Sequence, residues 1–346
     1  MNNDLWNALS HFQTRDLVER AYERRHLSKP TDSAVWEITS CFIQAREYFK
    51  SASDAAEAVR PLLLYYGVKS LSRGITLVLG MTPSSGHGLK VNAWESVLGN
   101  PSGDAILDLK VIVQNGTFLD LQIATADLLA EVIKDGDGTK SQLPRPALQP
   151  KQVVTLDDVL SRIPQISSIY RSVTERPLKN LDGSVSSNFG GYAVYVAIDA
   201  QAGIETEDQV RAVFQVPADV EIGLTPSSPT NGLPSMAYRI EGTHPGAASS
   251  PRPVIEFSGS YVPRKEVVWH HGIERIIVPW EGGVYVPPIL MGFLTSYVLG
   301  MLVRYFPARW MAIISGQKGD GMLPLLREAI DYVEREFPAM ALKILQ

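Results

Sequence analysis

The segment RPLLLYYGVKSLSRGITLVLG, residues 60–80, limits what this chain can fold into more than any other feature. Proline has no backbone N–H and clashes with the preceding helical turn, so we expect a helix to begin near Pro61 and to end at Gly80. The apolar residues cover nearly the whole circumference of that helix, which is typical of a helix buried on most sides. A buried polar group without a partner costs about 1–3 kcal/mol, so the hydroxyl and guanidinium groups on this helix are expected to have partners.

A second apolar segment, ILMGFLTSYVLGMLV, occupies residues 289–303 and stops at Arg304. A membrane span needs about 20 apolar residues, so this shorter segment favours a buried helix, and we expect no membrane insertion. Both apolar segments are too hydrophobic to be exposed, although they lie near opposite ends of the chain. The simplest packing therefore places the C-terminal helices against the N-terminal ones.

The residues between these helical ends have the pattern of strands. The stretch AILDLKVIVQNGTFLDL, residues 105–121, predicts two strands joined by a hairpin turn at Asn115-Gly116, because Asn-Gly is a strong two-residue hairpin signal. Apolar residues alternate again over 190–199 and 209–224, which indicates further strands.

We therefore predict an α+β fold, in which a helical bundle built from both N- and C-terminal segments carries a strand-rich insertion between them. The expected parts are an N-terminal helical segment over residues 1–104 and a strand-rich middle domain over 105–285. C-terminal helices over 286–346 are expected to pack on the N-terminal segment.

The formal net charge of −5 over 346 residues gives no long-range attraction for nucleic acid or an anionic membrane, but it leaves a local basic groove open. Cys41 is the single cysteine, which excludes an intrachain disulfide and a thiolate cluster for zinc and fits a reducing cytoplasm. His270 and His271 are adjacent, and adjacent strand residues point to opposite faces, so they predict no metal site.

Several common catalytic motifs are absent from the sequence: the phosphate-binding loop, the dinucleotide-binding G-x-G-x-x-G after a strand, H-E-x-x-H and G-x-S-x-G. Their absence argues against a P-loop nucleotide hydrolase, a dinucleotide oxidoreductase, a zincin and an α/β-hydrolase. We predict no cofactor.

The first candidate catalytic residue is His87, in the sequence Ser-Gly-His-Gly-Leu just after the buried helix. Flanking glycines let the backbone turn sharply and expose the imidazole, which can then act as an acid or base near neutral pH. The alternative is a turn histidine that bonds a carbonyl or the end of a helix.

Two groups of residues are candidates for ligand binding. On the central helix, Arg60, Tyr65, Tyr66 and Arg73 either line a polar pocket or form a hydrogen-bond network between the two helical ends.

The second group, Arg304, Tyr305, Arg309 and Trp310, is the densest cluster of arginine and aromatic residues. These residue types suit stacking on a base and pairing with phosphate, with Arg304 the candidate catalytic partner of His87. They equally suit cation–π contacts and packing at a helix end.

The elements RPLLLYYGVKSLSRGITLVL…HGLK and GFLTSYVLGMLVRYFPARWMAI together resemble the YaaC-like protein family. The resemblance covers the two helical ends. It implies a bacterial cytoplasmic protein and brings no established reaction with it. It also implies characteristic positions, which here are Tyr65, Tyr66, Gly67, His87, Gly88, Arg304, Tyr305 and Trp310.

The chain also has a looser similarity to HEPN-type helical domains, many of which are ribonucleases or nucleotide-modifying toxins. Their signature places a His a few residues after an Arg on a helix. Arg20…His26 fits on an expected helix, and Arg239…His244 and Arg264…His270 fit the spacing alone. With this many arginines the spacing is expected by chance, so the pattern discriminates poorly.

Two functions stay open at this point. The first is a protein directed at RNA or a nucleotide, such as a HEPN-like ribonuclease in stress or phage defence, with His87 as acid or base and Arg304 and Arg309 on phosphate. The second is a non-enzymatic binding or assembly subunit, whose partner is another protein or a second copy of the chain. The sequence does not decide whether the protein is an enzyme.

Overall fold

The computed structural model describes residues 3–99, 103–126, 147–187 and 286–346, together with shorter pieces at 132–134, 140–142, 194–198, 208, 211, 222–224, 254–257, 267–270, 273–278, 280 and 284. The chain divides into two compact units. The helical unit comprises Met1–Leu160, Ser168–Glu175 and Val286–Gln346, and the sheet unit comprises Ser161–Ser167 and Arg176–Tyr285.

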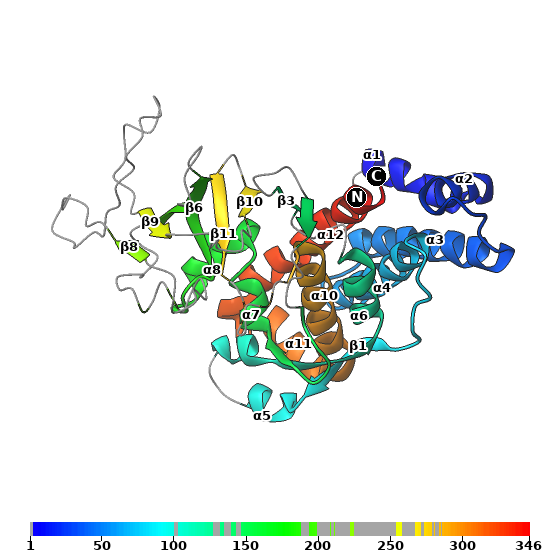
Figure 1. Ribbon diagram of the computed structural model, residues 1–346. Helices are drawn as coiled ribbons and strands as arrows, with labels where there is room; N and C mark the ends of the chain where they lie inside the picture. The colour runs from blue at the N-terminus through cyan, green and yellow to red at the C-terminus, as the bar shows by residue number, and fades with distance from the viewer. Residues whose placement is uncertain are drawn as a thin grey trace. The chain divides into compact units, whose positions relative to one another are not determined.

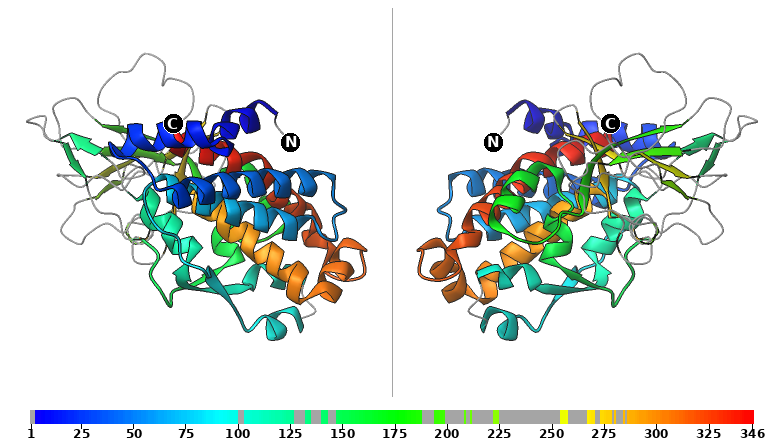
Figure 2. Two further views of the ribbon diagram at one scale, coloured as in Figure 1. Left: turned by 90° about the vertical axis from the view of Figure 1, so that its right-hand side faces the viewer. Right: turned by 90° about the vertical axis from the view of Figure 1, so that its left-hand side faces the viewer.

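The helices of the two chain ends lie side by side in the helical unit (Figures 1 and 2). The N-terminal part contributes α1 (Asn3–Leu9), η1 (Ser10–Gln13), α2 (Arg15–His26), α3 (Asp32–Asp54) and α4 (Arg60–Val78). The C-terminal part contributes α10 (Pro288–Tyr305), α11 (Pro307–Ile314), η6 (Asp320–Met322) and α12 (Leu323–Leu345). Helix α4 packs against α3, α10 and α12, and α1 packs against α12. The predicted α+β fold, with a bundle built from both ends, is confirmed.

Helix α4 is the centre of this bundle, as its sequence predicts. It begins at Arg60 with Pro61 in its first turn and ends at Val78, two residues before Gly80. Leu64, Val68, Leu71 and Ile75 are buried, and so are half of the residues between them. Because neighbours surround α4 on several sides, polar groups that it carries lie where α4 meets other elements.

Helix α10 is buried over its whole middle, from Ile289 to Val303. Among the described residues it is the one helix long and apolar enough to qualify as a membrane span, and 83% of that 18-residue window is buried inside the protein. Its hydrophobic surface is therefore covered by neighbouring elements of the same unit, including α4 and α12.

A small antiparallel sheet completes the helical unit, with strand order β1-β2-β5. The elements between α4 and α10 in this unit include β1 (His87–Asn92), α5 (Trp94–Gly99), η2 (Gly103–Asp108), β2 (Lys110–Gly116), α6 (Thr117–Thr125), β3 (Val132–Lys134), β4 (Lys140–Gln142), β5 (Val153–Thr155), α7 (Leu156–Leu160) and α8 (Ser167–Val173). Strand β1 pairs with β2 in a register that sets Leu89 opposite Val113 and Val91 opposite Val111.

The predicted hairpin at Asn115-Gly116 is wrong. Strand β2 ends at Gly116 and helix α6 begins directly at Thr117. Gly116 has φ +143°, and a Cβ at this position would lie 2.4 Å from the backbone N of Gly88. The glycine thus allows two backbone segments to pass close together where the strand joins the helix. A tight turn also requires glycine, so both structures have the same sequence signal.

The sheet unit holds a six-stranded sheet of order β10-β11-β6-β7-β9-β8, in which all neighbouring strands are antiparallel. Its strands are β6 (Asn180–Ser187), β7 (Val194–Ile198), β8 (Ile222–Leu224), β9 (Val254–Phe257), β10 (Val267–His270) and β11 (Ile273–Ile277), preceded by η3 (Pro164–Ile166). Arg162 Nε donates to the Val278 carbonyl at 2.8 Å, and its guanidinium lies 4.7 Å from the centre of the Trp280 ring. The strand-rich insertion is confirmed.

Candidate functional site

The Tyr65 hydroxyl of α4 hydrogen-bonds Nδ1 of His87, the first residue of β1. Tyr65 is fully buried and His87 is half-buried, so the phenol holds the imidazole at the boundary between core and surface. Tyr297 of α10 packs edge-to-face against Tyr65, with ring centres 5.5 Å apart, and donates its own hydroxyl to the Leu89 carbonyl at 2.9 Å. Three segments that are distant in sequence therefore fix the position of His87.

The loop before His87 is fixed by hydrogen bonds from both neighbouring helices. Thr117 of α6 donates its N–H and its hydroxyl to the Gly86 carbonyl, at 3.1 and 2.8 Å. Asp120 accepts from the N–H and hydroxyl of Ser84, at 2.6 and 3.0 Å. Arg73 of α4 donates to the Ser84 carbonyl at 2.8 Å and pairs with Glu37 of α3 at the same distance. Arg73 thus supports the loop that carries His87.

Arg304, in the last turn of α10, reaches the same place from the far end of the chain. Its guanidinium donates to the Tyr66 hydroxyl at 3.2 Å, and the Tyr66 ring stacks on Tyr48 of α3 with centres 5.6 Å apart. Arg304 is exposed. Its guanidinium carbon also lies 5.1 Å from the centre of the Tyr305 ring, a ring that is itself 54% exposed. The structure therefore brings together five of the predicted residues: His87, Tyr65, Tyr66, Arg304 and Tyr305.

Lys69 also belongs to this group, although it is not among the residues predicted from the sequence. It lies one helical turn after Tyr65 on α4, and its charge acts on His87 together with that of Arg304. Burial first, and then Arg73 and Arg304, lower the pKa of the Lys69 amine. Within the described part of the chain, neither Lys69 nor Arg304 forms an ion pair with a carboxylate. We call Tyr65, Tyr66, Lys69, His87, Tyr297, Arg304 and Tyr305 the His87 cluster.

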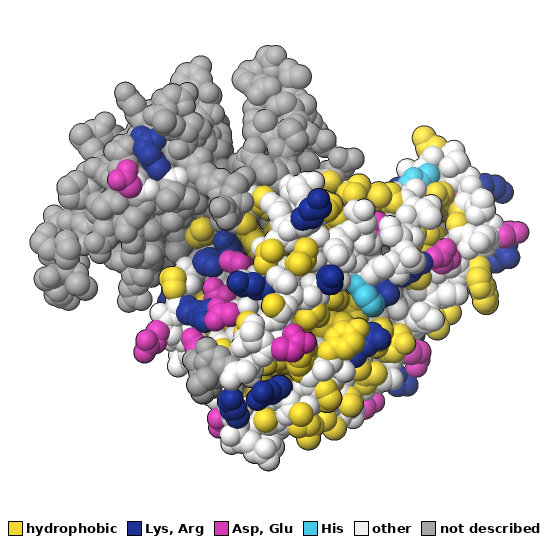
Figure 3. Space-filling model, turned by 90° about the horizontal axis from the view of Figure 1, so that it is seen from below, with side chains coloured by type: hydrophobic (Ala, Val, Ile, Leu, Met, Phe, Trp, Pro, Cys, Tyr) yellow, Lys and Arg dark blue, Asp and Glu magenta, His cyan; other side chains and the backbone are white. Residues whose placement is uncertain are grey.

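The electrostatics of the His87 cluster favour uncharged forms of its central groups. Burial of the imidazole, then the positive charges of Lys69 and Arg304, lower the pKa of His87. Burial raises the pKa of Tyr65 well above its ordinary value and that of Tyr297 to about 12. At neutral pH the site therefore holds a neutral imidazole and the protonated phenols of Tyr65 and Tyr297, and the charges of Lys69 and Arg304 act on the imidazole. Figure 3 shows a face of the molecule on which basic side chains lie around a broad hydrophobic area.

The Tyr65–His87 bond leaves the other ring nitrogen of His87 available. A phenol hydroxyl can donate or accept a hydrogen bond, so Tyr65 can partner either neutral tautomer of the imidazole. Nε2 has no hydrogen-bond partner among the residues that the structure describes. The imidazole can therefore take up or release a proton at Nε2 while Tyr65 holds Nδ1.

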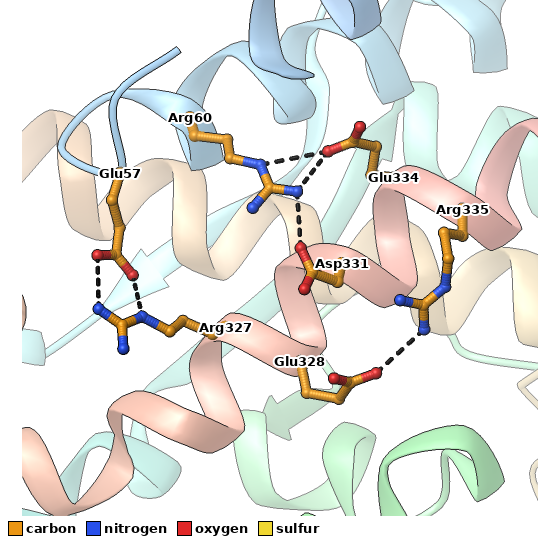
Figure 4. Close-up of polar contacts among 7 residues, drawn as sticks. All are labelled: Glu57, Arg60, Arg327, Glu328, Asp331, Glu334 and Arg335. Carbon is orange, nitrogen blue, oxygen red and sulfur yellow. Dashed lines mark hydrogen bonds and ion pairs between the residues drawn. The ribbon is translucent and has the colours of Figure 1, made fainter. Parts of the chain in front are cut away.

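Two predicted ligand-binding residues have hydrogen bonds that hold elements of the helical unit together instead. Arg60 bonds Asp331 at 2.6 Å and Glu334 at 3.2 Å, both on α12 (Figure 4). Trp310 is buried and donates its indole N–H to the Glu57 carbonyl at 3.1 Å. These contacts match the structural alternative. Arg309 is exposed on α11.

The Arg20…His26 pair lies on α2, as predicted, but His26 has a structural position. Its Nε2 lies 2.8 Å from the Val78 carbonyl, and its ring packs on Tyr22 with centres 4.1 Å apart. Arg239, His244, Arg264 and His271 lie outside the described residues, and so do the side chains of His270 and Glu274. Across the described part of the chain, no three His, Cys, Asp or Glu side chains are grouped to hold a metal ion.

Of the added residues, Lys69 could have been found from the sequence. It stands four residues after Tyr65 and four before Arg73, which places all three on one helix face. Tyr297 gives no such signal, because it lies inside a continuous apolar run.

Comparison with known proteins gives one match. The family model described as YaaC-like Protein matches residues 8–345, nearly the whole chain. No curated protein and no solved structure matches the chain.

Proposed function

The chain belongs to the YaaC-like protein family, and from this premise we propose that it is directed at RNA or a nucleotide through the His87 cluster, with His87 as acid or base and Arg304 on the phosphate. One observation carries the proposal. Lys69 and Arg304 come from opposite ends of the chain to the same histidine, and no described carboxylate pairs with either of them. Two unpaired cations repel each other, and an anionic ligand relieves that repulsion.

Phosphate is the anion that this arrangement suits best. Arginine offers paired N–H donors that match phosphate oxygens, and lysine acts as a compact point charge. A phosphate on Arg304 would lie near His87, because Arg304 bonds Tyr66, whose ring centre is 5.5 Å from that of Tyr65, the residue that bonds His87.

The same arrangement supports cleavage of RNA. His87 Nε2 takes the proton of a ribose hydroxyl as its oxygen attacks the neighbouring phosphorus, and the bond from phosphorus to the next ribose oxygen breaks. That leaving oxygen takes a proton from a water molecule, and the hydroxide that remains takes the proton back from His87, which returns to its neutral form. Arg304 and Lys69 stabilise the negative charge that builds up on the phosphate oxygens. A role in stress or phage defence stays a prediction.

The test is cleavage of RNA by the full chain. The wild-type protein is expected to cleave a labelled RNA, and His87→Ala is expected to lose about 100-fold or more in rate while keeping its thermal unfolding transition. His11→Ala is the matched control, because His11 is an exposed histidine of η1 outside the His87 cluster. Absence of cleavage by the wild-type protein, or full activity in His87→Ala, overturns the catalytic part of the proposal.

A second function, assembly with a protein partner or a second copy, is favoured by a different observation. Trp36 and Ile43 of α3 are 76% and 46% exposed and stand seven residues apart, which places them on one face of the helix. Under this proposal the His87 cluster is structural and the α3 face is covered in the complex. Sedimentation of the wild-type chain and of a Trp36→Ser, Ile43→Ser variant tests it. Self-association that the substitutions abolish supports assembly with a second copy.

A further inference from the structure

We propose that the ligand of the His87 cluster is single-stranded nucleic acid, with one phosphate on Lys69 and Arg304 and an adjacent unpaired base stacked on Tyr305. This inference rests on the nucleic-acid-directed part of the proposed function. It adds a substrate class, a second phosphate-binding residue in Lys69 and a role for Tyr305.

The case for Lys69 starts from its environment. A lysine normally keeps its amine in water, yet this one is half-buried, and the charges of Arg73, one helical turn further along α4, and of Arg304 act on it. Of these three cations, Arg73 is neutralised by Glu37. Lys69 and Arg304 have no corresponding carboxylate among the described residues. A half-buried lysine without a carboxylate partner, repelled by a second such cation at the surface, is costly for folding, which is expected where a ligand supplies the missing negative charge.

The case for Tyr305 starts from its exposure. The ring is 54% exposed although it adjoins the buried end of α10, and the Arg304 guanidinium lies 5.1 Å from the ring centre. Tyr305 directly follows Arg304 at the end of α10, and Arg304 bonds the Tyr66 hydroxyl at 3.2 Å, which places Tyr305 at the same cluster. An exposed aromatic ring beside a phosphate-binding cation is the combination that holds an unpaired base next to its own phosphate.

An exposed aromatic ring beside a phosphate-binding cation is expected to bind single strands more tightly than duplexes. In a duplex the bases are stacked and paired inside, so a single tyrosine on a protein surface cannot reach a base face. A single strand exposes base faces and phosphates together, and it also bends to fit a small site.

The experiment measures binding of the full chain to fluorescently labelled oligonucleotides as a function of salt. A single-stranded RNA is compared with the same sequence in a duplex, with a nucleoside monophosphate and with inorganic phosphate as competitors. The single strand is expected to bind about tenfold or more tightly than the duplex, because base stacking contributes only in the single strand.

Variants then assign the two contacts. Lys69→Met is expected to weaken single-strand binding about tenfold and to reduce the salt slope by about 0.7, the value for one phosphate contact on a single strand. Lys343→Met, at an exposed lysine of α12, is the matched control and leaves both unchanged. Tyr305→Leu is expected to weaken binding about tenfold, and Tyr305→Phe, which keeps the ring, is expected to bind like the wild type.

Three results overturn the inference: equal binding of single strand and duplex, an unchanged salt slope in Lys69→Met, or an unchanged affinity in Tyr305→Leu. Its failure is distinguishable from failure of the proposed cleavage. Loss of RNA cleavage in His87→Ala together with equal binding of single strand and duplex would keep the catalytic proposal and remove this one. Single-strand binding that depends on Lys69, without any cleavage of RNA, would keep the single-strand proposal and remove the catalytic one.

Discussion

Gly300 of α10 lies so close to Tyr65 of α4 that a Cβ at residue 300 would stand 2.7 Å from the Tyr65 Cβ. This contact limits how closely α10 and α4 can approach, and Tyr65 is also the residue that holds His87. The fold and the candidate site therefore depend on the same approach of two helices from opposite ends of the chain.

Gly300→Ala is expected to destabilise the protein by about 1–3 kcal/mol, because the new methyl group forces the two helices apart. Urea unfolding followed by circular dichroism measures the change. Gly321→Ala is the control, since a Cβ at Gly321 meets nothing within 4 Å. An unchanged midpoint in Gly300→Ala would show that α10 and α4 adjust to the methyl group without cost.

Arg60→Gln is expected to lower the free energy of unfolding by about 1–2 kcal/mol, because it breaks a partly buried pair that joins α4 to α12. Arg60 is 27% exposed, and its partner Glu334 is 13% exposed. Arg335→Gln is the matched control: its pair with Glu328 lies on α12 and is more exposed, so its loss is expected to cost little (Figure 4). Equal effects of the two substitutions in urea unfolding would contradict this reasoning.

Lys69→Met is expected to raise the melting temperature slightly, by a few degrees at most. The substitution removes a half-buried charge that is repelled by Arg73 and Arg304, and it keeps the apolar stem. Thermal unfolding measures the shift in the free protein. A lower melting temperature would indicate that Lys69 stabilises the fold, and its assignment as a ligand-binding residue would lose this support.

Protonation of His87 is expected to contribute to the pH dependence of the protein's stability. The pKa of His87 is lowered in the folded state, so below about pH 6.5 the unfolded chain binds the proton more readily than the folded chain. The contribution of His87 to the free energy of unfolding is therefore fully present at neutral pH. It is lost as the pH drops from about 6.5 through the lower pKa of the folded state. The groups that face the imidazole are Tyr65, Tyr297, Lys69 and Arg304.

The measurement is the melting temperature of the wild-type protein and of His87→Gln between pH 5 and 8. The wild type is expected to lose more stability toward pH 5 than His87→Gln does, since the other histidines contribute equally to both. Parallel curves would show that the imidazole protonates in the folded state without cost.

Much of the fold was predictable from local patterns. Pro61 and Gly80 delimit α4, and the apolar circumference of the helix indicates that it is central. The prediction of a hairpin at Asn115-Gly116 failed because the dipeptide indicates only the local backbone conformation. It does not indicate whether a strand or a helix follows, and here helix α6 follows. The glycine permits a close approach of the Gly88 backbone, and that approach exists only in the folded chain.

The sequence by itself determined that the two apolar ends must be buried, because neither segment is stable in water alone. It also supplied His87, Tyr65, Tyr66, Arg304 and Tyr305 as candidates by their chemistry. Only the tertiary structure decided that these residues meet, that Lys69 and Tyr297 join them, and that Arg60 pairs with α12. The physical reason is that pairing, burial and repulsion are properties of neighbours in space, and these neighbours come from opposite ends of the chain.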